Sequence, residues 1–183
     1  MKLLKLILVL SLSLAFSSQV LAQNKQFGYV GAKGCKMCHN TKKQGQQYKI
    51  WLKSKHAQAY KTLASEKAKA IAKEKGIADP QKADECLQCH VTAHGVDAKL
   101  LGKKYSIEEG VSCESCHGPG KVYKKKKTMI AISKGEIDPA SVGLIKPDEK
   151  TCKNCHNEKS PTFKEFDYEK FYEKIKHEKP KKS

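Results

Sequence analysis

The stretch Cys113-Glu114-Ser115-Cys116-His117 contains two cysteines three residues apart, with a histidine directly after the second. The pattern occurs in four copies, which together contain all eight cysteines of the 183-residue chain. The other three copies are Cys35-Lys36-Met37-Cys38-His39, Cys86-Leu87-Gln88-Cys89-His90 and Cys152-Lys153-Asn154-Cys155-His156. Two thiols at this spacing reach the two vinyl groups of one haem, and the histidine then directs its imidazole at the iron. The sequence therefore predicts four covalently attached haem c groups, each with a proximal histidine ligand.

Two other uses of paired cysteines account for the pattern less well. In an exported protein an even number of cysteines is compatible with disulfides, and two Cys-x-x-Cys units together can bind one zinc ion. Neither use explains a histidine after every second cysteine. We therefore prefer haem attachment to a disulfide framework or a zinc site.

The beginning of the chain has the pattern of an export signal. Lys2 and Lys5 precede an apolar run from Leu6 to Phe16, and this run is too short to cross a bilayer. Val20-Leu21-Ala22 fits a cleavage site. We expect residues 1–22 to be a signal peptide and residues 23–183 to form one tetrahaem cytochrome domain. The mature protein is then periplasmic or otherwise exported, without stable membrane insertion; the alternative, an uncleaved anchor, is disfavoured by the short run.

Composition and charge restrict the possible partners. Charged residues make up 30% of the chain and aromatic residues only 7%, so the polypeptide alone would have a thin core, which four apolar macrocycles would complete. The formal net charge is +17, and every basic residue is lysine. Export and the absence of arginine, the usual residue for base and phosphate recognition, argue against nucleic acid. We expect redox protein partners with acidic docking faces.

The histidines do not suffice for all axial positions. Four irons have eight such positions, whereas the chain has seven histidines. Besides the four in the motifs, only His56, His94 and His177 remain, so at least one iron lacks a second histidine from its own chain. His56 lies in a segment from Trp51 to Tyr60 that we predict to be helical, and we favour it as a distal ligand.

For the other two histidines the pattern leaves two uses open. His177 ends a run from Phe163 with a helical apolar stripe, and it is either a distal ligand or a residue that interacts with the end of the helix dipole. His94 follows His90 by four residues, so on a continuing helix it cannot reach the far face of the same haem. It either serves another iron or shuttles protons.

The rest of the pattern favours a mainly α fold, a small helical multihaem cytochrome with long loops in which the haems form the core. Residues 65–75 are rich in alanine, lysine and glutamate and stop at Gly76, as a glycine-capped helix would. The second and third motifs lie close in sequence, which favours two neighbouring haems. Gly118-Pro119-Gly120 predicts a sharp bend after the third motif.

These residues resemble the tetrahaem cytochrome c-554 family of ammonia-oxidising bacteria and its relatives. The resemblance covers nearly the whole mature chain and is most specific in residues 110–120, in residues 51–59 and in the Phe166-Asp167 stretch that leads to His177. It implies a helical tetrahaem fold with closely paired haems, three bis-histidine irons and one open iron on the second motif. It further implies that His56 serves the third haem and His177 the first.

One departure from the family concerns the fourth haem. The family has a distal histidine soon after the Gly-Pro-Gly bend, whereas this chain has Lys127 at about that place, with Met129 and Tyr123 nearby. Met129 is the only plausible methionine ligand, because Met37 lies between two haem-binding cysteines. The sixth ligand of the haem on His156 is therefore open: it is Lys127, Met129 or His94, or two irons of this chain lack a second histidine.

The function predicted from these features is electron transfer between redox partners, and we expect a carrier rather than an enzyme. One alternative is reduction of a small molecule, such as nitric oxide, nitrite or peroxide, at an open haem, with a histidine or Tyr123 supplying protons. Another is a haem wire, in which one copy lends a histidine to the next.

Overall fold

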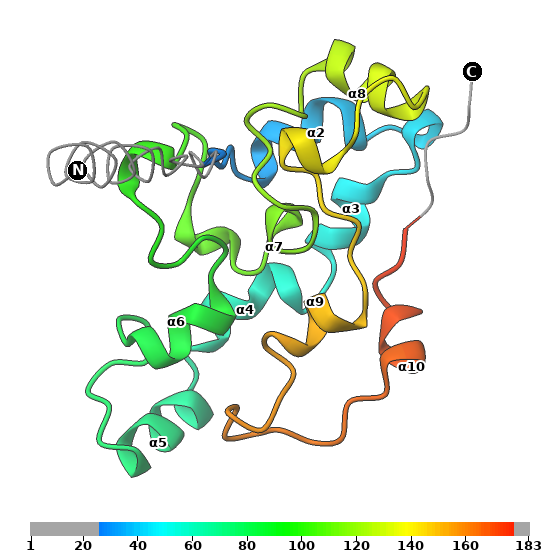
Figure 1. The fold of residues 1–183 in the computed structure, drawn as a ribbon. Coiled ribbons are helices and arrows are strands. Elements are labelled where there is room, and N and C mark those ends of the chain that lie inside the picture. Colours follow the sequence, from blue (N-terminus) through cyan, green and yellow to red (C-terminus); the bar gives the residue numbers. More distant parts are fainter. Residues whose placement is uncertain (1–25, 178–183) are drawn as a thin grey trace, which may run out of the picture.

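The computed structural model describes residues 26–177, so the predicted signal peptide lies outside the described residues. Within that range the chain forms short helices joined by long loops (Figure 1), which confirms the predicted mainly α fold class. The β-structure there is limited to an isolated parallel bridge between Tyr29 and Leu101. No helix of residues 26–177 is long and apolar enough to span a membrane.

The helices follow one another without forming regular layers. The α-helices are α2 (Ala32–His39), α3 (Gln47–Leu52), α4 (Ala59–Thr62), α5 (Glu66–Glu74), α6 (Asp84–His90), α7 (Cys113–His117), α8 (Lys126–Ser133), α9 (Glu149–Lys153) and α10 (Tyr168–Tyr172). The 3₁₀ helices are η1 (Lys42–Gln44), η2 (His56–Gln58), η3 (Ala98–Leu100), η4 (Ile107–Glu109) and η5 (Ala140–Val142).

All four cysteine motifs lie at the end of a short helix. In α2, α6 and α7 the motif histidine is the last helical residue. The fourth motif begins in α9, and the amides of Cys155 and His156 continue the turn by donating to the carbonyl of Cys152. Residues three and four apart share one face of a helical turn, so each motif presents both cysteines and its histidine on the same side.

The predicted helices differ from the structure in length more than in place. The helix expected over residues 65–75 is confirmed as α5, with the Ser65 hydroxyl accepting from the Ala68 amide at 3.2 Å and Gly76 at φ 69°. The segment from Trp51 to Tyr60 is not one helix, because α3 ends at Leu52 and the chain turns before η2 begins. The prediction of helical structure from Phe163 to His177 is also wrong in extent, because α10 spans only Tyr168–Tyr172.

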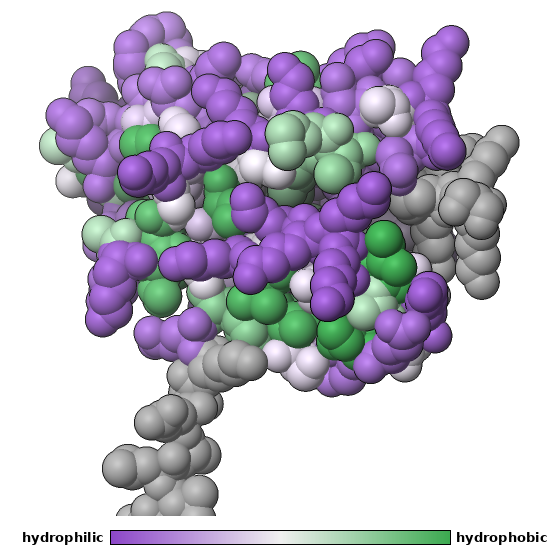
Figure 2. Space-filling model, turned by 90° about the horizontal axis from the view of Figure 1, so that it is seen from above, coloured by the Kyte–Doolittle hydropathy of each residue, from purple (hydrophilic) through white to green (hydrophobic). Residues whose placement is uncertain are grey.

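The polypeptide supplies a small apolar core of its own. Its buried hydrophobic residues in the described range are Val30, Ala32, Tyr48, Ala57, Leu63, Ala72, Val91 and Tyr123. Several large apolar side chains are exposed, with Met37 at 83% and Ile145 at 50%. Hydrophilic side chains cover much of the face seen in Figure 2, as expected from a net charge of +17. A domain of this size ordinarily buries more apolar surface, which fits a fold completed by large apolar groups.

Candidate haem sites

The structure brings His56 to the histidine of the fourth motif. The ring centres of His56 and His156 are 6.0 Å apart, and the ring planes are inclined at 73°. A first-row metal lies about 2 Å from an imidazole nitrogen, so two imidazoles on opposite sides of one metal have ring centres roughly 6 Å apart. The two rings are therefore spaced as the two axial ligands of one iron would be.

The second ring pair joins the last described residue to the third motif. The ring centres of His117 and His177 are 5.8 Å apart, with 65° between the planes. The Nδ1 atom of His177 lies 3.1 Å from the Ile175 carbonyl oxygen. Because a carbonyl can only accept, Nδ1 carries the proton and Nε2 keeps its lone pair for a metal.

These pairings differ from those implied by the family resemblance. The resemblance placed His56 with the third motif, yet its ring meets that of the fourth. It placed His177 with His39, yet the ring of His177 meets His117. His56 lies in η2 and His177 lies beyond the end of α10, and the ring that each one meets is decided by how the intervening loops close in space.

Burial favours the neutral, metal-binding form of three of these imidazoles, those of His56, His117 and His156. The pKa of His56 is lowered by burial and further by His156, and the pKa of His117 is lowered by burial and by His177. Burial also lowers the pKa of His156. A neutral imidazole offers a nitrogen lone pair, whereas an imidazolium does not, so these shifts favour ligation.

In the first and second motifs each histidine ring is held from its Nδ1 side. His90 Nδ1 lies 2.8 Å from the Ala59 carbonyl oxygen in α4, which leaves Nε2 with the lone pair. His39 Nδ1 lies 3.3 Å from Oε1 of Gln47, and the Gln47 amide in turn donates to the Gln44 carbonyl. Such partners fix the orientation of a ligating ring. Sequence reasoning had not singled out Gln47, because a glutamine carries no pattern signal.

The remaining ligand candidates lie elsewhere. His94 Nε2 lies 2.9 Å from Asp84 Oδ1, so in this arrangement that nitrogen contacts a carboxylate and does not face another histidine ring. Lys127 is exposed and Met129 half-buried on α8, while the ring that meets His156 is that of His56. The Tyr123 hydroxyl donates to the Gly118 carbonyl at 2.8 Å, and burial raises its pKa, so this residue holds its proton.

The cysteines of different motifs also meet. Cys35 of the first motif shares a hydrogen bond with Cys113 of the third, which lowers the pKa of Cys35 and raises that of Cys113. Burial, together with Cys89 of the second motif, raises the pKa of Cys155 in the fourth to about 12. These are the thiols that would form thioether bonds to haem. The first motif thus adjoins the third, and the second adjoins the fourth.

The second and third motifs, which are close in sequence, are joined through a buried threonine. Thr92 Oγ1 lies 2.7 Å from the Ser115 hydroxyl and 3.1 Å from that of Ser112. It also donates to the Gly110 carbonyl and accepts from the Ser112 amide. The polypeptide segments of the second and third motifs are therefore in contact, while the closeness of their two haems stays a prediction.

The third motif also sets the place of His56. The Val111 amide donates to the His56 carbonyl at 3.0 Å, and the Trp51 indole N–H donates to the Val111 carbonyl at 2.9 Å. Gly110 has φ 64°, and a Cβ there would lie 2.7 Å from the His56 carbonyl oxygen. Only glycine permits this close approach of two backbones. On the other side, Phe166 stacks on His156 with ring centres 4.6 Å apart, a contact that sequence reasoning missed.

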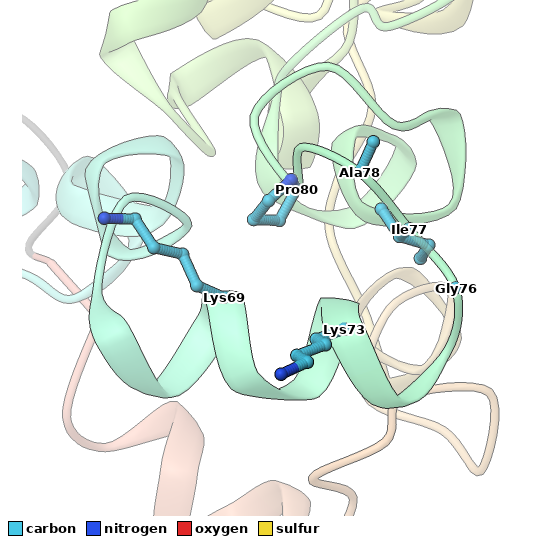
Figure 3. Close-up of a pocket in the computed structure, with 6 residues that line it drawn as sticks. All are labelled: Lys69, Lys73, Gly76, Ile77, Ala78 and Pro80. Atoms are coloured by element: carbon cyan, nitrogen blue, oxygen red, sulfur yellow. The ribbon is translucent and has the colours of Figure 1, made fainter.

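A pocket of about 430 Å³ lies away from these sites. It lies between α5 and the loop that follows (Figure 3), and its lining residues are Lys69, Lys73, Gly76, Ile77, Ala78 and Pro80. No motif cysteine or candidate ligand lines it. We therefore assign it no part in haem binding.

The residues present fit covalently bound haem: each motif presents two thiols and an imidazole from one helical turn, and two pairs of imidazoles have the spacing of axial ligands. The fold and these sites define the class as multihaem c-type cytochromes.

The comparisons with known proteins give the family within that class. Residues 34–118 match the family model described as cytochrome c554 and c-prime, and this region therefore belongs to that family. The chain is also 32% identical over 157 residues to cytochrome c-554 of Nitrosomonas europaea. That alignment covers 76% of this chain but only 61% of the relative, so the chain spans less than two thirds of its length. No solved structure gives a significant match. The resemblance stated from the motifs is confirmed.

Proposed function

We propose that the protein is an exported electron carrier with four haem c groups, one on each motif. When bound, haem supplies an iron that cycles between ferric and ferrous states. The polypeptide attaches the groups through its eight cysteines, holds them close to one another and orients the axial imidazoles. The relative from Nitrosomonas europaea is by its name a cytochrome c, and the match to the cytochrome c554 family supports electron transfer as the function.

The single observation that carries the proposal is the pair of histidine contacts, His56 with His156 and His177 with His117. Two histidines occupy both axial positions of an iron and leave none for a substrate, so these two haems suit electron transfer rather than catalysis. The close approach of motifs from different parts of the chain gives electrons a path from one haem to the next.

The proposal is tested by measuring haem content and iron spin state on the purified protein. We expect four haems per chain from the pyridine haemochrome assay and mass spectrometry, and low-spin electron paramagnetic resonance signals from at least the haems on His117 and His156. A chain with cysteines in disulfides and no covalent haem would overturn the proposal.

A second candidate function is favoured by the His94–Asp84 pair. His94 binds Asp84 instead of facing another histidine ring, and Asp84 is the first residue of α6, which carries His90. The iron on His90 is then the candidate for an open position, where a small molecule such as nitric oxide, nitrite or peroxide could bind and be reduced, with His94 as a proton source. Turnover of one of these molecules by the reduced protein would support it; binding without turnover would leave electron transfer as the function.

A third possibility is self-association into a haem wire through a histidine lent by a neighbouring copy. It predicts assembly that depends on protein concentration. Sedimentation of a monomer at micromolar concentration would exclude it.

A further inference from the structure

Glu114, which lies between the two cysteines of the third motif, is among the most buried charged residues of the described chain. It is 2% exposed. Its Oε1 atom accepts from the amides of Val30 at 2.9 Å and Gly120 at 2.6 Å. Its Oε2 atom accepts from Val30 at 3.0 Å and from Gly31 at 2.8 Å. Each oxygen thus accepts two hydrogen bonds from backbone N–H groups. The donors come from two loops that lie far from each other in sequence, at residues 30–31 and at residue 120.

A second carboxylate extends this contact along the first-motif helix. Glu109 accepts from the amides of Ala32 at 2.8 Å and Lys33 at 3.4 Å. The N-cap residue of α2, Gly31, has no side chain to cap the helix. Four consecutive amides, residues 30–33, therefore donate to two carboxylates from the third-motif segment. The start of a helix carries a partial positive charge, which an anion stabilises.

The contact joins the polypeptide around two haem sites. Helix α2 packs against α7 (Figure 1), and their cysteines Cys35 and Cys113 share a hydrogen bond. The Glu114 carboxylate acts electrostatically on both of these sulfur atoms. It therefore lies at the junction of the first and third motifs.

The charge at this junction is not cancelled by a nearby lysine. None of the ion pairs formed among the described residues includes Glu114, although the chain contains many lysines. Burial raises the pKa of Glu114, while the amides of Gly120, Val30 and Gly31 oppose that rise. Because every partner is a donor, only the ionised carboxylate satisfies all of these contacts.

We propose that Glu114 is a positioning residue that holds the first and third haem motifs together and whose buried negative charge lowers the reduction potentials of the haems on those two motifs. The inference rests on the proposed function. Reducing a ferric iron adds one negative charge, and a fixed carboxylate in a poorly solvated site opposes that addition more strongly than one in water. The oxidised forms of these two haems are therefore stabilised relative to the reduced forms.

The test compares Glu114→Gln with Glu108→Gln in the full haem-loaded protein. Glu108 lies in the same segment and is exposed, so its replacement removes an equal charge from the solvated surface. Potentials are measured by redox titration followed in the visible spectrum and by electron paramagnetic resonance. We expect Glu114→Gln to raise two of the haem midpoint potentials, while Glu108→Gln leaves all of them near the wild-type values.

A Glu114→Gln protein with full haem content and wild-type potentials would overturn the inference. Because haem content is measured separately, that result differs from failure of the proposed function, in which no covalent haem is found. If Glu114→Gln does not accumulate, Glu114→Asp keeps the charge and is expected to keep the low potentials. If neither folds, hydrogen exchange of the wild-type amides of Val30, Gly31 and Gly120 decides: slow exchange supports the contact, and exchange as fast as in exposed loops overturns it.

Discussion

His56 and the fourth-motif histidine show how much one residue determines at the proposed sites. We expect His56→Ala to leave the iron on His156 without a second histidine. Electron paramagnetic resonance of the oxidised protein should then show a high-spin signal increased by about one iron in four. His94→Ala is the control, since His94 binds Asp84 and its loss should leave the spin states unchanged. An unchanged spectrum for His56→Ala would contradict the ring pairing.

For replacement of Lys127 or Met129 we expect no change of spin state, in contrast to His56. The sequence suggested them as ligands for the haem on His156, but the imidazole ring that lies 6.0 Å from that of His156 is the ring of His56. We therefore expect Lys127→Ala and Met129→Ala to retain the low-spin signal of the wild type. A loss of one low-spin signal in either variant, with haem content unchanged, would show that the sequence-based alternative was right.

At the scale of elements, the hydrogen bond from Trp51 in α3 to Val111 before the third motif can be tested by its contribution to stability. Trp51→Phe removes the indole N–H that donates to the Val111 carbonyl but keeps an aromatic ring beside Tyr48. We expect a loss of about 1 kcal/mol in the free energy of unfolding, measured by denaturant titration. The exposed Ser133→Ala, which also removes a donor to a carbonyl, should cost less than 0.5 kcal/mol, roughly the limit for surface changes. Equal losses would contradict a special role for Trp51.

The bend after the third motif can be tested by comparing a glycine in the bend, Gly118, with a glycine beyond the end of α8, Gly135. Gly118 has φ 75° and Gly135 has φ 77°, so alanine is strained similarly at both. A Cβ at Gly118 would collide with the Gly143 carbonyl, whereas one at Gly135 meets nothing within 4 Å. We expect Gly118→Ala to lower the melting temperature clearly more than Gly135→Ala, with reduced haem content. Similar effects would mean that backbone strain alone matters at the bend.

At the scale of the whole molecule, we expect the surplus of lysine to govern the encounter with redox partners. The net charge of the full chain is +17, or +15 without Lys2 and Lys5 of the predicted signal peptide. Such a charge attracts acidic proteins, and dissolved salt weakens this attraction. We expect the second-order rate of electron exchange with an acidic redox protein to fall as ionic strength rises, measured by stopped flow. Exchange with a basic redox protein is the control and should become faster. A rate with the acidic protein that does not depend on salt would argue against electrostatic docking.

The sequence by itself determined the haem-binding chemistry, because the two thiols and the imidazole of each motif lie within five residues and their geometry is local. Helix α5 was predictable because its signals are also local. Its helix-forming composition, its Ser65 cap and the glycine after its end all lie in one continuous stretch of the chain. The predicted shortage of axial ligands, with seven histidines for the eight positions of four expected irons, followed from counting alone.

Only the tertiary structure decided which distant segments meet. His56 and His177 come to their partner rings through loops, and the backbone hydrogen bond from Val111 to His56 leaves no pattern in the sequence. The same holds for Glu114, which looked like a spacer between two cysteines until folding brought the amides of residues 30, 31 and 120 around it. Contacts of this kind depend on how loops close in space, and local propensity does not encode loop closure.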